Sequence, residues 1–304
     1  MKKILVTGGT GFIGRKVCDT LHNKDYDVNV VSRNPEKAKT KLEAVGEIYG
    51  WNPESEQLPT EAISETEAVI HLAGETIAGR WNTEKKQRIR DSRVLSTRNL
   101  VESCANAESK PDVLICASAI GLYGDSGDNS FTEETPPGTD YLAEVCKEWE
   151  TEAYKASELG IRVVTVRIGL VLGLGGGMLQ QVLTPFKIGI GGKLGSGQQW
   201  MSWIHVDDVV GIILHALEND SINGALNATA PVPVRNIEFT KALGSVLGKP
   251  TILPAPYFGL KLMMGEFADF VLLSQKVLPE KTVASGYEFQ FTTIDSALSD
   301  LLLK

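Results

Sequence analysis

The chain has 304 residues, of which 42% are apolar, 7% aromatic and 22% charged, with 30 glycines and 13 prolines. This composition excludes a disordered or fibrous chain, and the length suits one large domain or a core domain with a smaller partner. The formal net charge is −8, because 38 acidic residues outnumber 30 basic ones, and no long basic run occurs. We therefore expect neither nucleic acid nor a membrane surface as a partner.

No stretch reaches the roughly 20 continuous apolar residues of a membrane span. The apolar run at the start turns at once into Gly8-Gly9 and lacks the core of a secretory signal. The four cysteines are scattered, so we expect reduced core thiols in a cytoplasmic protein. The four histidines do not cluster with cysteines or acids at ligand spacing, and no metal site is expected.

In chain order, short β-branched runs alternate with longer amphipathic stretches through residues 1–170, a pattern typical of βαβ units and a parallel sheet. Asn34 and Pro35 add a helix cap and a first-turn proline. The expected strands are Lys3–Val6, Val28–Ser32, Ala68–Leu72, Val113–Cys116 and Arg162–Ile168. The expected helices are Phe12–Leu21, Pro35–Leu42, Thr83–Cys104 and Tyr141–Leu159.

After Gly169 the chain becomes rich in glycine up to Gly197, which indicates sharp bends or a close approach of backbone to a ligand. Helices are expected again at Asp207–Leu217 and Arg235–Leu247, and a tail rich in proline and large apolar residues starts at Pro250. The fold class predicted is α/β: a Rossmann-like doubly wound parallel sheet with a smaller C-terminal α+β lobe. The nucleotide-binding domain is expected over residues 1–170, with later returning segments. The lobe and tail are expected over 171–304, above the carboxyl edge of the sheet, where such folds bind ligands.

The strongest motif follows the first strand directly and opens the first helix: Thr7-Gly8-Gly9-Thr10-Gly11-Phe12-Ile13-Gly14. Gly8 permits a tight turn, Gly11 lets backbone approach a pyrophosphate, and Gly14 permits close packing of helix on strand. An ordinary turn does not need three glycines at this spacing. The motif predicts a dinucleotide whose phosphates meet the helix N-terminus, with Gly8, Thr10, Gly11, Phe12, Ile13 and Gly14 in contact.

The choice of dinucleotide depends on the end of the second strand, where an acid would hold the ribose 2′-hydroxyl of NAD. The chain has Ser32 and Arg33 there, a hydroxyl and a guanidinium that suit a 2′-phosphate. This pair predicts NADP(H). The alternative is that Arg33 is a solvated loop charge.

Small residues follow the fourth expected strand. Leu72, Ala73, Gly74 and Glu75 leave room for the adenosine half of the cofactor at the sheet edge, and we predict all four as cofactor contacts. His71, just before them, is interpreted as a core histidine rather than a ligand.

These motifs together resemble the short-chain dehydrogenase/reductase superfamily in its extended form. The matching segments are Thr7–Gly14, His71–Gly74, Ser118–Gly124 and Trp203–Val209. An atypical, epimerase-like branch is more similar still, on Arg80-Trp81, Asp91–Arg93, Arg167–Gly173, Leu226–Pro231 and the tail from Gly265 to Pro279. The resemblance covers essentially the whole chain and implies a Rossmann-like domain, a small substrate lobe and a nicotinamide cofactor.

The chemistry of the superfamily normally uses Tyr-x-x-x-Lys on a helix, because residues four apart share one face. Lys147 is present and is predicted to hold the nicotinamide ribose, but the tyrosine position is Ala143. Tyr141 precedes Lys147 by six residues, about 600° of helical rotation and so about 240° away in direction. The usual acid/base is therefore missing.

Other groups remain as candidates for the reacting end. Ser118 is predicted to hydrogen-bond a substrate carbonyl, although it precedes Tyr123 by five residues where the family spacing is four. Tyr123 is the nearest alternative phenol, and packing against the sheet is the competing interpretation. Glu75 is another ionisable candidate, with a simple surface charge as its alternative. Without a tyrosine, drawing the proton from water or substrate would lower the rate by about 10²–10⁴-fold.

The segment from Gly191 to Trp203 has one formal charge, Lys193, and suggests an uncharged or weakly charged substrate. Trp200 and Trp203 either face that substrate or form the core of the lobe. His205 and Asp207 are interpreted as strand-end and helix-cap residues.

We interpret the chain as an NADP(H)-dependent oxidoreductase or epimerase-like enzyme acting on an unidentified small molecule. The alternative is a catalytically inert protein that senses NADP(H), which Ala143 motivates. A sugar-nucleotide epimerase with trapped NAD is a third hypothesis, weakened by Arg33 and by the lack of an evident arginine cluster for a diphosphate. The sequence leaves open the substrate, the reaction direction and the oligomeric state, a homo-oligomer included.

Overall fold

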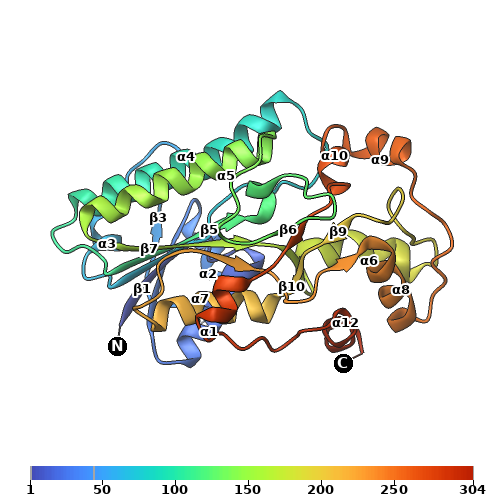
Figure 1. Ribbon diagram of the computed structural model, residues 1–304. Helices are drawn as coiled ribbons and strands as arrows, with labels where there is room; N and C mark the ends of the chain where they lie inside the picture. Colours follow the sequence, from blue (N-terminus) through green and yellow to red (C-terminus); the bar gives the residue numbers. More distant parts are fainter. Residues whose placement is uncertain (1, 44, 304) are drawn as a thin grey trace.

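A parallel sheet forms the centre of the molecule. The structure is a computed structural model that describes residues 2–43 and 45–303, and within them the main sheet has seven strands in the order β11-β7-β5-β4-β1-β2-β3 (Figure 1). The strand order runs outward in both directions from β1, which confirms the predicted doubly wound, Rossmann-like sheet. The bounds are β1 Lys3–Thr7, β2 Asp27–Ser32, β3 Ile48–Gly50, β4 Ala68–His71, β5 Val113–Ala119, β7 Arg162–Ile168 and β11 Gly224–Ala228.

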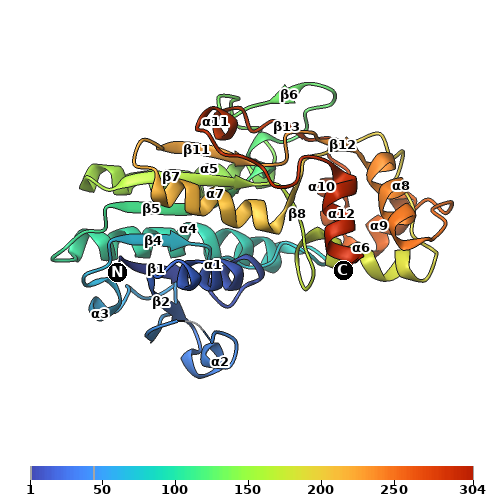
Figure 2. The same ribbon diagram turned by 90° about the horizontal axis from the view of Figure 1, so that it is seen from below.

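Helices cover both faces of the sheet, as Figures 1 and 2 show. On one face lie α3 (Thr60–Ile63), α4 (Thr83–Asn106) and α5 (Tyr141–Tyr154), and on the other α1 (Phe12–Asn23) and α7 (Val206–Glu218), while α2 (Pro35–Lys39) follows β2. Burial on both faces explains why Val, Ile, Leu and Ala make up most of β1, β4 and β7. Two separate apolar clusters form the core, one on each side of the sheet.

A smaller lobe lies beyond the carboxyl ends of the strands. It is built around the fully buried Trp203, whose indole N–H donates to the carbonyl of Val232 at 3.0 Å. Its elements are β8 (Leu170–Leu172), α6 (Gly177–Lys187), β9 (Trp200–Met201), β10 (Trp203–His205), β12 (Val234–Arg235), α8 (Asn236–Leu247) and α12 (Ile294–Leu302). Between these, the chain returns to the main domain for α7 and β11.

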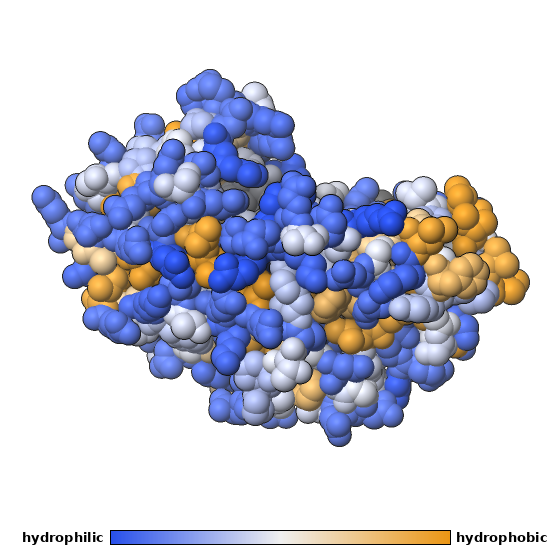
Figure 3. All heavy atoms as spheres, turned by 90° about the horizontal axis from the view of Figure 1, so that it is seen from above, coloured by the Kyte–Doolittle hydropathy of each residue, from blue (hydrophilic) through white to orange (hydrophobic). Residues whose placement is uncertain are grey.

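The tail carries short elements that join the two parts. β13 (Lys276–Val277) pairs with β6 (Ser130–Phe131), and α11 (Glu280–Ala284) contacts β11. Upstream, α9 (Tyr257–Met264) and α10 (Phe267–Val271) follow each other. Phe258, Leu262 and Met263 of α9 are exposed, and hydrophobic side chains gather at that end of the surface in Figure 3. Among the described residues no helix has the length and apolar character needed to cross a membrane.

Several glycines after Gly169 approach a side chain of the protein itself. A Cβ on Gly173 would lie 2.4 Å from the ring of Phe12, and one on Gly176 would lie 2.2 Å from it. This segment therefore packs its backbone flat on the first residue of α1. Of the two expectations for these glycines, sharp bends fit Gly175 and Gly177, which have φ values of +81° and +67°, while at Gly173 and Gly176 the close neighbour is Phe12.

Candidate functional site

The turn after β1 has the geometry of a phosphate-binding loop. Gly8 has a φ of +69°, and a Cβ there would lie 2.6 Å from the carbonyl carbon of Leu72. A Cβ on Gly14 would lie 2.2 Å from the carbonyl oxygen of Gly8, so both positions require glycine. Gly11 caps α1 without any side-chain hydrogen bond, and the first turn contains no acid. The first amides of α1 and the positive end of its dipole are thus available to a phosphate.

A pocket of about 200 Å³ opens over this turn. It extends from the end of β2, with Ser32 and Arg33, across the turn to the end of β4, with Gly74 and Glu75. Nine predicted cofactor contacts line it: Gly8, Thr10, Gly11, Ser32, Arg33, Leu72, Ala73, Gly74 and Glu75. Six further residues line it that were not predicted as cofactor contacts: Thr7, Val31, Trp51, Pro53, Glu54 and Ser92.

Four other predicted contacts lie elsewhere. Phe12 packs on the glycines of the lobe, Ile13 packs against the core, and Gly14 is buried beneath Gly8. Gly14 therefore shapes the turn without lining the pocket. Lys147 is exposed on α5 and does not line the pocket either.

His71 at the end of β4 is a core residue. It is fully buried, its Nδ1 lies 2.7 Å from Oγ1 of Thr7, and its Nε2 lies 3.0 Å from Oγ1 of Thr97 on α4. Oγ1 of Thr7 accepts from the amides of Leu72 and Ala73, so its own proton goes to Nδ1. Burial lowers the pKa of His71 to about 3. The ring stays neutral and joins β1 to α4.

Glu75 is held as an anion beside the pocket. Nζ of Lys85 donates to its Oε1 at 2.6 Å, and this hydrogen bond keeps the pKa of Glu75 below its usual value. An ionised carboxylate cannot donate a proton to a reacting carbonyl. Glu75 is therefore unsuited to the role of general acid.

Ser118 and Tyr123 belong to a buried polar network. Ser118 donates to Oε1 of Glu150 at 2.6 Å, and Nε and Nη2 of Arg167 donate to the two oxygens of the same carboxylate at 2.9 Å each. Nη1 of Arg167 donates to the phenol oxygen of Tyr123 at 2.8 Å, and Tyr123 donates to Asn227 at 2.7 Å. Burial raises the pKa of Tyr123 to about 12. The two predicted catalytic hydroxyls are engaged within the protein, and neither lines the pocket.

The register of α5 explains why Lys147 lies apart from the pocket. Asp140 caps the helix, accepting from the amides of Leu142 and Ala143, and this sets which residues face inward. Ala143 is fully buried, whereas Lys147 is exposed. The pair four apart that meets the turn after β5 is Leu142 and Cys146, because a Cβ on Gly121 would touch both of them. The ribose-binding role predicted for Lys147 has no support in this geometry.

In the lobe, the two tryptophans differ. Trp203 is core, whereas Trp200 is half-buried at the surface, with the guanidinium of Arg235 at 4.2 Å from its ring centroid and Nζ of Lys276 at 4.9 Å. Neither ring lines the pocket described above.

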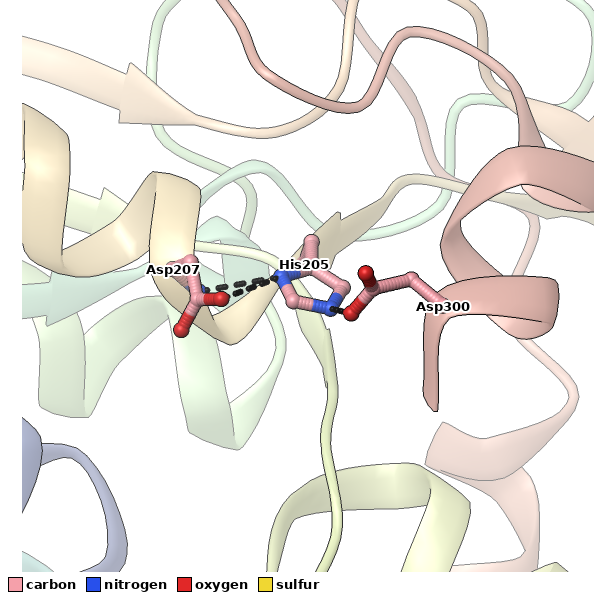
Figure 4. Close-up of side chains that lie close together, drawn as sticks. All are labelled: His205, Asp207 and Asp300. Carbon is pink, nitrogen blue, oxygen red and sulfur yellow. Dashed lines mark hydrogen bonds and ion pairs between the residues drawn. The ribbon is translucent and has the colours of Figure 1, made fainter. Parts of the chain in front are cut away.

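One cluster of a histidine and two acids lies between α7 and α12 (Figure 4). Nδ1 of His205 accepts a hydrogen bond from the amide of Asp207 at 3.1 Å, so His205 both ends β10 and caps α7, whereas Asp207 lies in the first turn of that helix. The neutral ring must then carry its proton on Nε2, which lies 3.6 Å from Oδ2 of Asp300. The two carboxylates flank the ring from opposite sides (Figure 4). We interpret the cluster as a connection between α7 and the C-terminal helix, because the nitrogen that faces Asp300 carries the proton of the neutral ring.

Fold and pocket together define an α/β protein of the dinucleotide-binding class. The chain matches the model of the NAD dependent epimerase/dehydratase family over residues 4–228, and a domain of unknown function, DUF1731, over residues 255–301. The chain therefore belongs to the NAD dependent epimerase/dehydratase family.

Similarity to relatives over nearly the full length of the chain supports this family membership. An epimerase family protein SDR39U1 homolog from Arabidopsis thaliana is 44% identical over 98% of this chain and 86% of its own. The epimerase family protein YfhF of Bacillus subtilis is 36% identical, covering 98% and 97%. A crystal structure of human epimerase family protein SDR39U1 with NADPH superposes with a TM-score of 0.88 at 32% identity, covering 99% of both chains. The predicted epimerase-like branch is thereby confirmed.

A more distant comparison concerns the fold alone. UDP-glucuronic acid 4-epimerase from Bacillus cereus has a TM-score of 0.80 at 18% identity, covering 99% of this chain and 98% of the other.

Proposed function

We propose that this protein binds NADP(H) and uses it in an oxidoreductase or epimerase-like reaction on a small molecule. The observation that carries the proposal is the position of Arg33 and Ser32 in the wall of the pocket, at the strand end where NAD-binding relatives of this fold need an acid. A guanidinium and a hydroxyl at this place bind a 2′-phosphate. The human SDR39U1 structure, which contains NADPH, supports the same choice.

The chain's own residues account for binding of the cofactor. The first amides of α1 would meet the diphosphate, Arg33 the 2′-phosphate, and the backbone around Ala73 the middle of the dinucleotide. Bound NADP(H) would supply or accept the hydride. Because Ser118 and Tyr123 are engaged within the protein, the proton that accompanies the hydride would come from water or substrate. The four cysteines are free and buried, which suits the reducing cytoplasm in which we place the protein.

A second function, that of a sensor which binds NADP(H) without turnover, is supported by a separate observation. Ala143 is fully buried, and the residues that line the pocket include no tyrosine, histidine or cysteine. A protein that binds NADP(H) and signals its presence without turnover needs no acid/base in that place. Such a sensor would keep the cofactor pocket and lack only the acid/base residues that turnover needs.

An assay for hydride transfer distinguishes the enzyme from the sensor. Purified protein is mixed with NADPH and a panel of small aldehydes, ketones and 2-oxo acids, and NADPH absorbance is followed. Consumption of NADPH by wild type and its loss in Arg33→Ala at limiting NADPH would support the enzyme. Tight binding of NADPH with no consumption across the panel would support the sensor. Absence of NADPH binding would contradict both.

A further inference from the structure

Arg93 of α4 places a guanidinium at the β4 end of the pocket. A Cβ on Gly74 would lie 3.5 Å from its Cζ and 3.6 Å from its Nη2, and both Gly74 and the neighbouring Ser92 line the pocket. On the other side, Cζ lies 5.3 Å from the centroid of the buried Trp149 ring of α5. The guanidinium is thus half-buried between the pocket and the helix that normally carries the reacting residues in this fold.

The hydrogen bonds of Arg93 use only one of its nitrogens. Nη1 donates to the carbonyl oxygens of Glu75 and Ile89 at 3.0 Å each, with Oγ of Ser92 at 3.5 Å. Within residues 2–43 and 45–303, Nε and Nη2 donate to no protein atom, and no carboxylate forms an ion pair with Arg93. The nearby carboxylate of Glu75 is bound to Lys85. Neither of these two nitrogens is fully enclosed, and Gly74 and Ser92 beside the guanidinium line the pocket, whereas Arg93 itself lies just behind that lining.

A second arginine of this protein, Arg167, shows which group can bind to these two guanidinium nitrogens. Arg167 also uses Nη1 for neutral oxygens, the phenol of Tyr123 and the carbonyl of Glu133. Its Nε and Nη2 form a planar fork that binds the carboxylate of Glu150 with two bonds of 2.9 Å. Arg93 likewise uses Nη1 for neutral oxygens, and its Nε and Nη2 have no hydrogen-bond partner among the described residues. Two parallel N–H groups match the two oxygens of a carboxylate, and a buried guanidinium is stabilised by such a partner.

The topology identifies where that carboxylate comes from. In the proposed mode of binding, the first amides of α1 would hold the diphosphate of the cofactor and Arg33, at the end of β2, would hold its 2′-phosphate. Arg93 lies near Gly74, which follows β4 on the other side of β1, and so would be left for a negative charge that the cofactor does not supply. Resting on the proposed binding of NADP(H), we propose that Arg93 binds a carboxylate of the substrate through Nε and Nη2. The substrate class is then a small carbonyl or hydroxy acid, more acidic than the wall from Gly191 to Trp203 suggested.

The test measures recognition of a carboxylate without knowledge of the true substrate. Pyruvate and its neutral amide, pyruvamide, are titrated separately into wild type saturated with NADPH, with cofactor fluorescence as the readout, and the NADPH Kd is measured first. The variants are Arg93→Met, Arg93→Lys and, as matched control, Arg98→Met. Arg98 lies on the same helix, is exposed and is already paired with Glu152 at 2.8 Å. Thermal unfolding of each variant checks that it is folded.

We expect wild type to bind pyruvate at least about tenfold more tightly than pyruvamide, the effect of one charge-assisted pair. Arg93→Met should abolish that preference, Arg93→Lys should keep part of it because an ammonium lacks the fork, and Arg98→Met should keep all of it. NADPH affinity should stay within about twofold of wild type throughout.

Three results would overturn the proposal. The first is equal affinity of wild type for pyruvate and pyruvamide, and the second is a preference for pyruvate over pyruvamide that survives in Arg93→Met. The third is an Arg93→Met variant that loses affinity for NADPH but none for pyruvate. The last would make Arg93 a cofactor ligand. Failure of wild type to bind NADPH contradicts the proposed function instead. The pyruvate titration of the unliganded protein, followed by tryptophan fluorescence because Trp149 lies against the Arg93 guanidinium, then still tests the fork.

Discussion

Arg167 binds Glu150 through two parallel hydrogen bonds of 2.9 Å, from Nε to Oε1 and from Nη2 to Oε2. Both side chains are buried, and the pair joins β7 to α5. Ser118 donates to the same carboxylate. The serine that sequence reasoning offered to a substrate is therefore part of the framework that holds the sheet and helix together.

Glu150→Gln should lower the free energy of unfolding by about 3 kcal/mol, because it leaves the Arg167 charge buried without a counter-charge. Urea denaturation measures this. The control is Glu84→Gln, which removes an exposed partner of Arg88 and should cost less than about 1 kcal/mol. Equal small effects for both variants would show that the Arg167–Glu150 pair is not a buried, coupled unit.

Tyr123→Phe should affect stability and leave cofactor binding unchanged. The variant removes the partner of Asn227 and one acceptor of Arg167, which should cost about 1–3 kcal/mol in urea denaturation. NADPH affinity measured by fluorescence should stay within about twofold of wild type. A loss of turnover of about a hundredfold or more with unchanged stability would assign the phenol to catalysis after all.

Ala143→Tyr should not restore the acid/base of the superfamily. Ala143 is fully buried, so the added ring has to displace core atoms, at a cost of about 1–3 kcal/mol. We expect a lower melting temperature and no gain in NADPH consumption. Leu142→Tyr is the informative comparison, because Leu142 contacts Gly121 and lies on the side of α5 that meets the turn after β5. A gain of activity in Ala143→Tyr would contradict the helix register described above.

His71 should make the protein less stable in acid. Its pKa is about 3 in the folded chain against 6.5 for an ordinary histidine, so between these values the unfolded chain binds a proton that the folded chain does not. The free energy of unfolding should therefore fall by about 1.4 kcal/mol for each pH unit below about 6.5 from this group alone. His71→Gln should reduce that slope, and His22→Gln, at an exposed position of α1, should keep it. An unchanged slope in His71→Gln would contradict the assignment.

The sequence predicted the fold and the cofactor end well because both rest on local signals. Gly8 and Gly14 obey steric requirements between neighbouring residues, and β7 was predicted with its correct bounds because its run of valines is buried on both faces. Trp51 was missed because β3 has three residues, too few for a visible period, and only tertiary pairing with β2 brings the following loop to the pocket.

The reacting end depends on long-range packing, which a single sequence does not reveal. The Tyr-x-x-x-Lys spacing drew attention to Lys147, but the register set by the Asp140 cap turns that residue to solvent. Arg93 stood in a motif used only for the family resemblance. Its significance appears only when α4 and α5 are packed and the partners of each guanidinium nitrogen can be counted.

The central claim is that Arg33 selects NADP(H), and paired titrations test it most directly. NADPH and NADH are titrated into wild type and Arg33→Ala by fluorescence. We predict that wild type binds NADPH at least about a hundredfold more tightly than NADH. In Arg33→Ala this preference should fall at least about tenfold, because the Kd for NADPH rises while the Kd for NADH stays the same, as expected for the loss of a charge-assisted contact. Equal affinity of wild type for the two cofactors, or binding of neither, would contradict the account.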